Sequence, residues 1–342
     1  MSASATSPPA AGGARMAERR FRVMGSDAHV IVVGGADDDA GEEVERRADE
    51  SLLDHAQKRL DHLESLWSRF RPDSEVTRLT ECAGEWVTVS EETSILVRRA
   101  VEAWRISGAS FDPTVLGDML RAGYDRTFDA LATTPVRSGL SRLLQGAADI
   151  DVDGNRVRLP EGTGFDPGGI GKGLAADFVT GELLAAGAAG VCVNVGGDLR
   201  VRGTGPGEGG GWTVGIEHPW LDEPLALVGL LDGAMVTSTT LKRHWTVDGE
   251  ERHHLIDPGT GRPSTSDLTL VTVIATEGWR AEILAKAVLL RGSEHPFDLL
   301  GGTGAEALCL DRDGRVQSTD GFAAFLGTAT LPARVDASPP AV

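Results

Sequence analysis

Apolar residues recur at helical spacing in two long stretches of the N-terminal half. Between residues 41 and 67 they share one face, which predicts a long amphipathic helix, at positions Val44, Ala48, Leu52, Leu60, Leu63 and Trp67. Ser90, which precedes two glutamates, is a good N-cap for a second helix that runs to Ile106. Residues 281–290 carry a similar pattern, so we expect a further helix there.

Shorter apolar runs separated by glycine and aspartate predict strands. Residues 21–33 indicate one strand, interrupted at Met24-Gly25-Ser26 by a bulge or a ligand contact. Residues 149–160 predict a hairpin, residues 191–195 a buried strand, and residues 200–273 a series of short strands. Strands joined mainly by hairpins, with unevenly distributed helices, favour an α+β class over a doubly wound parallel sheet.

The net charge of the chain limits the kinds of partner that it can bind. The chain has 342 residues, with 33 lysines and arginines against 51 aspartates and glutamates, so its formal net charge is −18. This balance argues against nucleic acid and against anionic lipid, since both are bound by clustered cations. No window approaches 18 apolar residues, so no membrane insertion is expected. The length fits two domain-sized units, or one large unit with two lobes.

The termini and the cysteines suggest a cytoplasmic protein. Residues 1–18 are rich in Ala, Ser, Pro and Gly without the apolar stretch of a signal peptide, so we expect a disordered leader there and a tail over residues 330–342. The three cysteines, Cys82, Cys192 and Cys309, form no CxxC or Cys/His cluster. They give little support to a zinc or iron–sulfur site and fit a reducing compartment.

Residues 166–173 contain four glycines in six positions ahead of a predicted helix, together with Lys172. Such a loop can bring backbone amides to a phosphate at the helix N-terminus, or it can serve only as a turn for tight packing. It is not a Walker loop, because that motif needs Ser or Thr where this chain has Gly173. Residues 194–198 end a buried strand in Gly-Gly, which indicates either another close backbone approach or a bulge.

Two polar pairs are candidates for chemistry. Adjacent histidines on a strand point to opposite faces, so only one of His253 and His254 can face a given site. His254 and Asp257 could form a general base with an orienting carboxylate, or lie at an exposed Asp-Pro turn. Glu282 and Lys286 are four residues apart on a predicted helix, a spacing that taken alone is typical of a surface pair.

In this order, seven segments together resemble the motifs of the FAD:protein FMN transferases, the ApbE family. They are Met24-Gly25-Ser26, residues 68–75, Phe111-Asp112-Pro113-Thr114, and residues 166–173, 194–198, 236–238 and 254–263. Each is weak alone, but seven in the family's order are unlikely to arise by chance. The resemblance therefore outweighs the structural interpretations of the single motifs.

The resemblance implies an ApbE/T-fold-like α+β fold of largely antiparallel sheets with flanking helices. It implies one transferase domain over residues 19–329, whose two interleaved lobes enclose a cleft for FAD. The implied reaction cleaves the FAD pyrophosphate, attaches FMN to a Thr or Ser hydroxyl of an acceptor flavoprotein and releases AMP. The family uses Mg²⁺, which would neutralise charge on the pyrophosphate and on the leaving phosphate.

Residue roles follow from the same resemblance. Flavin contacts are expected from Met24, Phe70, Ser110, Phe111, Asp112, Asp166, Lys172 and Leu255. The metal would be held by backbone carbonyls at Gly169 and Gly171 and by the carboxylate of Glu282. His254 is the candidate base for the acceptor hydroxyl.

Three positions depart from the family pattern. Phe70 replaces the usual tyrosine, which keeps an aromatic ring but removes a hydroxyl. Glu282 replaces an aspartate ligand, and Lys286 replaces a threonine ligand. A charged lysine cannot bind Mg²⁺. Either Lys286 supplies the positive charge itself, or the metal is held more loosely by Glu282, carbonyls and water.

Two other functions compete with transfer. A protein with an altered metal helix could bind FAD without transferring FMN, or could act as an FAD pyrophosphatase in which water replaces the acceptor hydroxyl. A nicotinamide dehydrogenase fits poorly, because no GxGxxG motif with a later acidic residue follows a predicted strand.

Overall fold

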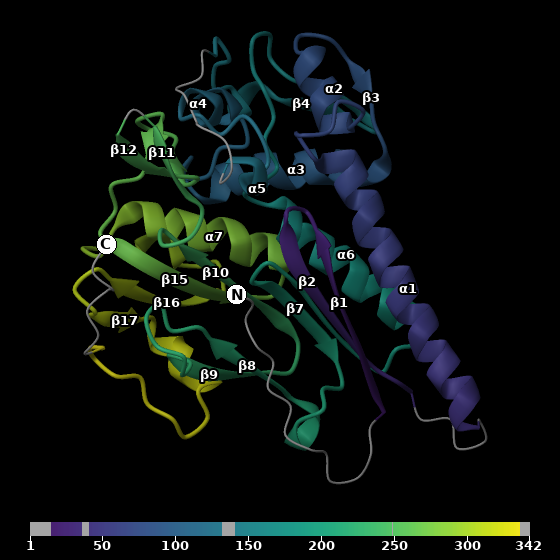
Figure 1. Ribbon diagram of the computed structural model, residues 1–342. Coiled ribbons are helices and arrows are strands. Elements are labelled where there is room, and N and C mark those ends of the chain that lie inside the picture. The colour runs from purple at the N-terminus through teal and green to yellow at the C-terminus, as the bar shows by residue number, and fades with distance from the viewer. Residues whose placement is uncertain (1–14, 36–40, 132–140, 248, 336–342) are drawn as a thin grey trace.

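An eight-stranded antiparallel sheet forms the centre of the molecule (Figure 1). The computed structural model describes residues 15–35, 41–131, 141–247 and 249–335. The strand order is β1-β2-β6-β7-β10-β15-β16-β17. These strands are β1 (Met16–Val23), β2 (Ser26–Val33), β6 (Gly190–Val195), β7 (Asp198–Gly203), β10 (Gly233–Thr239), β15 (Leu268–Ala275), β16 (Glu306–Asp311) and β17 (Val316–Ser318).

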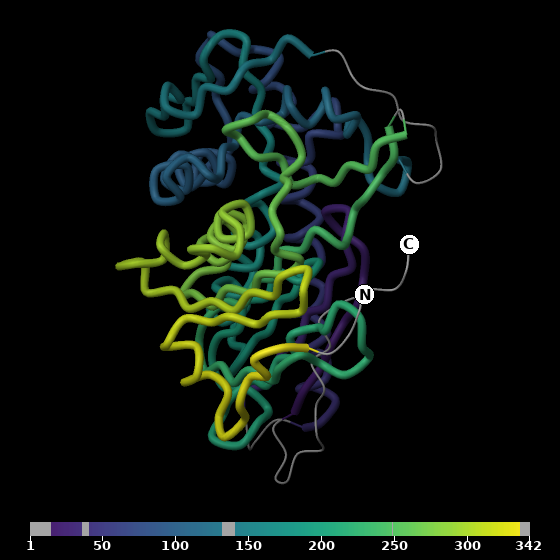
Figure 2. The backbone as a smooth tube through the Cα atoms, turned by 90° about the vertical axis from the view of Figure 1, so that its left-hand side faces the viewer, coloured from purple at the N-terminus to yellow at the C-terminus, as the bar shows by residue number. Residues whose placement is uncertain are grey.

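Both faces of this sheet are covered at its centre, where every residue of β6 and β15 is buried, whereas the edge strands β1 and β17 are partly exposed. Three helices lie on one face, namely α1 (Glu42–Trp67), α6 (Gly171–Ala185) and α7 (Gly278–Arg291). The hairpin of β8 (Trp212–Ile216) and β9 (Ala226–Leu230) covers the other face, beside the short 3-10 helix at Asp320–Phe325. Figure 2 shows these layers from the side. Successive residues of β2 alternate between the two cores: Val30 packs beneath the helices, and Ile31 packs against the hairpin.

A second group of elements lies beyond the helices. It contains α2 (Glu75–Glu81), α3 (Glu91–Ile106), α4 (Leu116–Arg121), α5 (Phe128–Leu131) and the small sheet of β3 (Val87–Thr88), β5 (Arg156–Arg158) and β4 (Asp151–Asp153). Two further hairpins are β11 (His244–Val247) with β12 (Glu250–His253), and β13 (Ile256–Asp257) with β14 (Arg262–Pro263). In Figure 1 the second group and the β11–β12 hairpin lie above α7.

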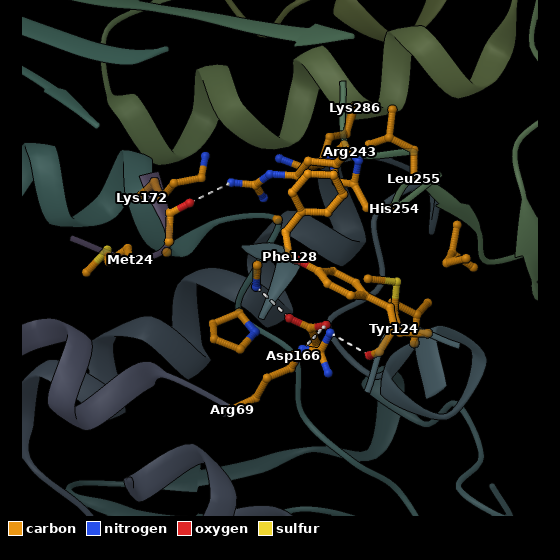
Figure 3. A pocket seen from close by; sticks show the side chains of 18 of the residues that line it. Met24, Arg69, Tyr124, Phe128, Asp166, Lys172, Arg243, His254, Leu255 and Lys286 are labelled. Atoms are coloured by element: carbon orange, nitrogen blue, oxygen red, sulfur yellow. Dashed lines mark hydrogen bonds and ion pairs between the residues drawn. The ribbon is translucent and has the colours of Figure 1, made fainter. Parts of the chain in front are cut away.

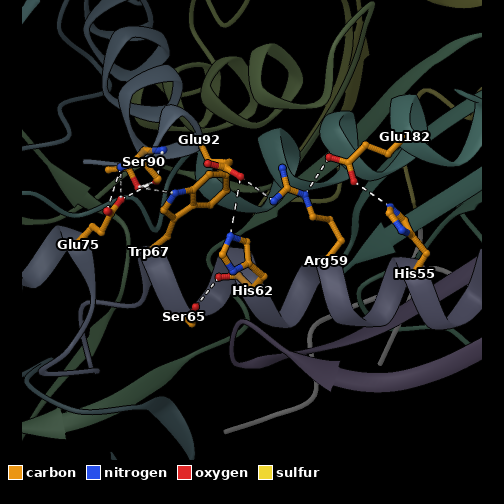
Figure 4. A network of polar contacts seen from close by, with 10 residues as sticks. His55, Arg59, His62, Ser65, Trp67, Glu75, Ser90, Glu92 and Glu182 are labelled. Carbon is orange, nitrogen blue, oxygen red and sulfur yellow. Dashed lines mark hydrogen bonds and ion pairs between the residues drawn. The ribbon is translucent and has the colours of Figure 1, made fainter. Parts of the chain in front are cut away.

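A polar network fastens α1 to this frame (Figure 4). Arg59 donates from Nε to Glu182 on α6 and from Nη1 to Glu92 on α3, both at 2.8 Å. Beyond the last turn of α1, Glu75 accepts a hydrogen bond from the Ser90 backbone N–H at 2.9 Å. This bond joins α2 to the start of α3. The helices that support the sheet are therefore tied to those of the second group.

The α+β class and most of the expected elements are confirmed. Both long helices begin within one residue of the expected positions, and the Ser90 side chain caps α3 by accepting the Thr93 backbone N–H. The hairpin expected at residues 149–160 is present as β4 and β5. Of the helices that the structure describes, none combines the length and the apolar character needed to cross a membrane.

The single strand expected over residues 21–33 is wrong. The chain turns at Met24 and Gly25, whose φ angles of 51° and 63° are those of a two-residue hairpin turn, so that Val23 pairs with Ser26. Secondary structure and hydrogen bonds are also described just outside the domain expected over residues 19–329. Strand β1 begins at Met16, and the Val335 N–H donates to the Gly314 carbonyl at 2.8 Å. The remaining leader and tail residues, 1–14 and 336–342, lie outside the described residues.

Candidate active site

A cavity of about 310 Å³ opens between the helices that cover the sheet and the second group of elements. All eight expected flavin contacts line it: Met24, Phe70, Ser110, Phe111, Asp112, Asp166, Lys172 and Leu255. Gly169, Gly171, His254 and Lys286 also line it, whereas Asp257 and Glu282 do not. Segments separated by more than 200 residues thus converge on one hollow, as Figure 3 shows for ten of the side chains.

One end of the cavity is aromatic. The rings of Phe70 and Tyr124 lie 5.9 Å apart, and the guanidinium of Arg69 lies 4.2 Å from the first ring centre and 4.7 Å from the second. Arg69 is fixed by its buried ion pair with Asp166, at 3.2 Å, and by its bond to the Tyr124 carbonyl, at 2.9 Å. This end can hold a flat ring system against aromatic faces.

The opposite end is cationic. Lys172, at the start of α6, contacts Asp198 and lies 3.3 Å from Glu282 Oε1. Lys286 of α7 lies 3.1 Å from the same oxygen. The guanidinium of Arg243 lies nearby and donates to Ser26 Oγ at 3.0 Å (Figure 3). Burial lowers the pKa of Lys172 to about 8, although Glu282 opposes this shift.

His254 lies between the two ends and is half-buried, with its Nδ1 inaccessible to solvent. Burial lowers its pKa well below 6.5, and the nearby Arg243 and Lys286 lower it further. Its Nδ1 has no hydrogen-bond partner among the described residues. A neutral imidazole can accept a proton at a ring nitrogen. The neighbouring His253 points elsewhere and contacts the Ser264 carbonyl at 3.0 Å.

The expected pairing of His254 with Asp257 is wrong. Asp257 Oδ1 accepts the Gly259 backbone N–H at 2.9 Å, and Oδ2 lies 3.2 Å from the Thr260 hydroxyl. The carboxylate therefore stabilises the turn that follows β13, as Asp-Pro-Gly turns do. Its role in the site is to shape the loop that carries the cavity-lining Pro258.

Both glycine-rich segments are used for close approach. A Cβ on Gly173 would lie 2.4 Å from the Gly278 carbonyl oxygen, so the glycines let α6 and α7 approach each other there. Gly196 and Gly197 form the two-residue turn between β6 and β7 rather than a bulge. A Cβ on Gly196 would lie 2.6 Å from Ser26 Oγ. These turns bring Lys172 and Asp198 together.

Among the cavity residues that were not identified from the sequence are Arg69, Tyr124 and Arg243. Arg69 lies inside a motif that was recognised, and Tyr124 is the single tyrosine of the chain, so both offered a weak signal. Arg243 lies in a basic run with no recognisable spacing. Only the β11–β12 hairpin, which follows it, explains why it reaches the cavity.

The residues at the expected metal position do not fit a magnesium ion. Glu282 is fully buried, its Oε1 faces two ammonium groups, and its Oε2 accepts the Gly173 N–H at 2.9 Å. Burial alone would raise the pKa of Glu282, but Lys172 and Lys286 overcome this and lower it. In the described part of the chain no three His, Cys, Asp or Glu side chains cluster as a metal would require.

Comparison with known proteins points to one family. The sequence model of the ApbE family matches residues 24–309. An FAD:protein FMN transferase of Vibrio cholerae is 26% identical over 280 residues, covering 80% of this chain and 81% of that protein. One of Treponema pallidum is 30% identical over 282 residues, covering 77% of this chain and 78% of that protein.

Solved structures agree as well. The ApbE protein of Thermotoga maritima superposes with a TM-score of 0.78 at 24% identity, covering 91% of this chain and 99% of that one. The flavinyl transferase ApbE of Pseudomonas stutzeri, in its apo form, gives 0.76 at 25% identity, covering 92% and 98%. The resemblance and the fold expected from the motifs are confirmed, and the chain belongs to the ApbE family.

Proposed function

We propose that this chain is an FAD:protein FMN transferase that moves FMN from FAD to a Thr or Ser hydroxyl of an acceptor protein. The observation that carries the proposal is one cavity with an aromatic end, a cationic end and a neutral, half-buried histidine between them. An isoalloxazine ring suits the first end, and a diphosphate suits the second. The names of the relatives support the same activity.

The chemistry assigns a role to each part of the cavity. The acceptor hydroxyl oxygen attacks the phosphorus of the FMN half, and the bond from that phosphorus to the bridging oxygen breaks. AMP leaves with the bridging oxygen, and the hydroxyl proton passes to His254. Lys172, Lys286 and Arg243 stabilise the charge that develops on the phosphate oxygens, because fixed cations in a buried site act strongly on such charge.

The aromatic end orients the flavin half of the substrate. Phe70 and Tyr124 offer ring faces, and the ion pair of Arg69 with Asp166 holds the wall between them and the glycine-rich loop. Met24 and Leu255 add apolar contacts from two other segments. We propose that residues 19–329 act as one transferase domain, whose two interleaved lobes meet at this cavity.

The family resemblance also implies a divalent metal, which the side chains around Glu282 do not fit. A divalent ion would supply charge neutralisation at the diphosphate. In this chain the Gly169 and Gly171 segment lines the cavity, but the Glu282 carboxylate is already occupied by lysines. No step of the mechanism above is assigned to a metal. A Thr or Ser acceptor and a cytoplasmic location are part of the same proposal.

One incubation separates the three candidate functions. The purified chain is mixed with FAD and a protein extract of its source cell, and AMP, free FMN and protein-bound flavin are measured. AMP in equal amount to protein-bound FMN supports the transferase. AMP with free FMN alone indicates a pyrophosphatase, and bound FAD without AMP indicates a binding protein. A His254→Ala variant provides the background of the AMP and FMN signals and should still bind FAD.

A further inference from the structure

The cationic end of the cavity carries more lysine than the rest of the molecule would predict. The chain has four lysines among its 33 lysine and arginine residues, and two of the four, Lys172 and Lys286, face this cavity. Elsewhere positive charge is nearly always arginine. A lysine ammonium is a compact point charge with three donors, which resembles a small cation more closely than the planar guanidinium does.

We propose that this chain binds the diphosphate of FAD without a divalent metal, through a clamp made of Lys172, Lys286 and Arg243, with Glu282 as the internal counter-ion of the two lysines. The proposal rests on the proposed function, because it takes FAD as the ligand. It concerns only how the diphosphate is neutralised.

Both carboxylate oxygens of Glu282 already have partners. Its Oε1 lies 3.3 Å from Lys172 Nζ and 3.1 Å from Lys286 Nζ, and its Oε2 accepts the Gly173 N–H at 2.9 Å. A metal that used this carboxylate would have to displace both lysines or lie beside two positive charges. Magnesium also requires a near-octahedral set of oxygen ligands, to which an ammonium group contributes nothing.

The side chains at the cationic end also carry a net positive charge. Three cations, Lys172, Lys286 and Arg243, face two carboxylates, Glu282 and Asp198. The cavity end therefore keeps a positive charge before any ligand enters, which suits a diphosphate. A bound divalent ion would raise that charge by two within a buried region.

Arg243 is held in a fixed position at this end of the cavity. Its backbone has a φ of 58°, a conformation that residues with a side chain adopt only at some cost. The side chain is held across the hairpin turn of β1 and β2 by a 3.0 Å bond to Ser26 Oγ. A strained residue that is fixed in this way and lines the cavity is a pre-positioned anion ligand.

Titration calorimetry with FAD tests the clamp directly, in EDTA and in millimolar Mg²⁺. We expect the dissociation constant of the wild-type chain to change by less than about twofold between the two buffers. The Lys286→Thr variant restores a neutral oxygen ligand. We expect it to bind FAD at least about tenfold more weakly in EDTA, and to recover when Mg²⁺ is added. Lys242→Thr, at a surface ion pair with Glu217, is the matched control and should match the wild type in both buffers.

Wild-type FAD binding that weakens about tenfold or more in EDTA would overturn the clamp and favour a metal held by Glu282, carbonyls and water. Manganese binding, followed by electron paramagnetic resonance, gives a second readout. The wild-type chain with FAD should bind no stoichiometric Mn²⁺, and one tight Mn²⁺ per chain would contradict the proposal. Metal-independent FAD binding without transfer would refute the proposed function and leave the clamp intact. Strictly metal-dependent FAD binding together with transfer would refute the clamp and leave the proposed function intact.

Discussion

Gly173 and Gly278 face each other where helices α6 and α7 meet. A Cβ on Gly278 would lie 2.5 Å from the carbonyl oxygen of Gly173, and the reverse substitution would create a 2.4 Å contact. Both distances are to backbone atoms, which cannot rotate away. The close approach sets the distance between Lys172, beside the first glycine, and Glu282, one turn beyond the second.

We expect Gly278→Ala to force the two helices apart. The free energy of unfolding should fall by about 1–3 kcal/mol, as for other overpacked interiors, and FAD affinity should fall with it. Chemical denaturation and calorimetry measure the two effects. Gly181→Ala on the partner helix α6 is the control, because its Cβ would meet only the tip of Arg202 at 3.8 Å. That variant should be as stable as the wild type or more so.

We expect Phe70→Ala to weaken FAD binding by about tenfold, because one wall of the aromatic end is lost. Phe70→Tyr should bind at least as tightly as the wild type, since it keeps the ring. Quenching of flavin fluorescence measures both constants. Trp86 is another exposed aromatic residue that stacks on arginines, and it lies outside the cavity. Equal losses in Trp86→Ala and Phe70→Ala would remove the assignment of the aromatic end.

We expect His254→Ala to lose nearly all transfer, by about 10²-fold or more, while FAD affinity stays within a few fold. The reason is that the imidazole accepts the hydroxyl proton and is not one of the cations that bind the diphosphate. Single-turnover AMP release gives the rate, and calorimetry gives the affinity. An unchanged rate would show that another group is the base.

The pH dependence of transfer should reflect the lowered pKa of His254. Burial and the nearby cations keep the imidazole neutral as the pH falls through 6.5, so the base stays available in that range. We expect no loss of rate between pH 7.5 and 6.5 from this group, with its acid limb at lower pH. Nitrogen-15 NMR of the imidazole gives the titration directly. A titration near 6.5 in the folded protein would contradict the buried site.

We expect Arg59→Ala to destabilise the fold by about 1–2 kcal/mol at neutral pH, because it removes both bonds that join α1 to Glu92 and Glu182. Although burial acts to raise the pKa of Glu92, Arg59 lowers it below its unfolded value. This contribution is therefore complete above pH 4.5 and is lost as the pH falls through the folded pKa. Thermal melts at pH 7 and pH 3.5 measure the difference. Arg46→Ala, at an exposed pair on the same helix, should cost much less.

Local signals predicted much of the fold. The helix from Glu42 to Trp67 and the Ser90 cap were readable because an amphipathic stripe and a capping serine act over a few residues. The turn at Met24 was missed because a two-residue turn of Met and Gly lacks the usual Asn-Gly signature. The order of strands in the sheet depends on long-range pairing, which spacing along the chain does not encode.

The candidate site, like the fold, could be predicted from the sequence only in part. Motifs located the glycine-rich loop and His254, and these do meet in one cavity. Spacing alone suggested that Glu282 and Lys286 form a surface pair, whereas Glu282 is fully buried, because the burial depends on α6 crossing over α7. The pairing of His254 with Asp257 failed for a similar reason. Proximity in sequence could not reveal that the turn's own amides already occupy that carboxylate.

The cavity takes its walls from nearly the whole length of the chain, since Met24 and Gly25 at one end of the sequence meet Arg243, and Lys286 completes the opposite wall. While the chain is being synthesised on the ribosome, no N-terminal portion that ends before α7 contains all the walls of this cavity. The nascent polypeptide must therefore bring strands β1 to β15 together through long-range contacts without help from the substrate, and flavin can stabilise the chain only after α7 has been made.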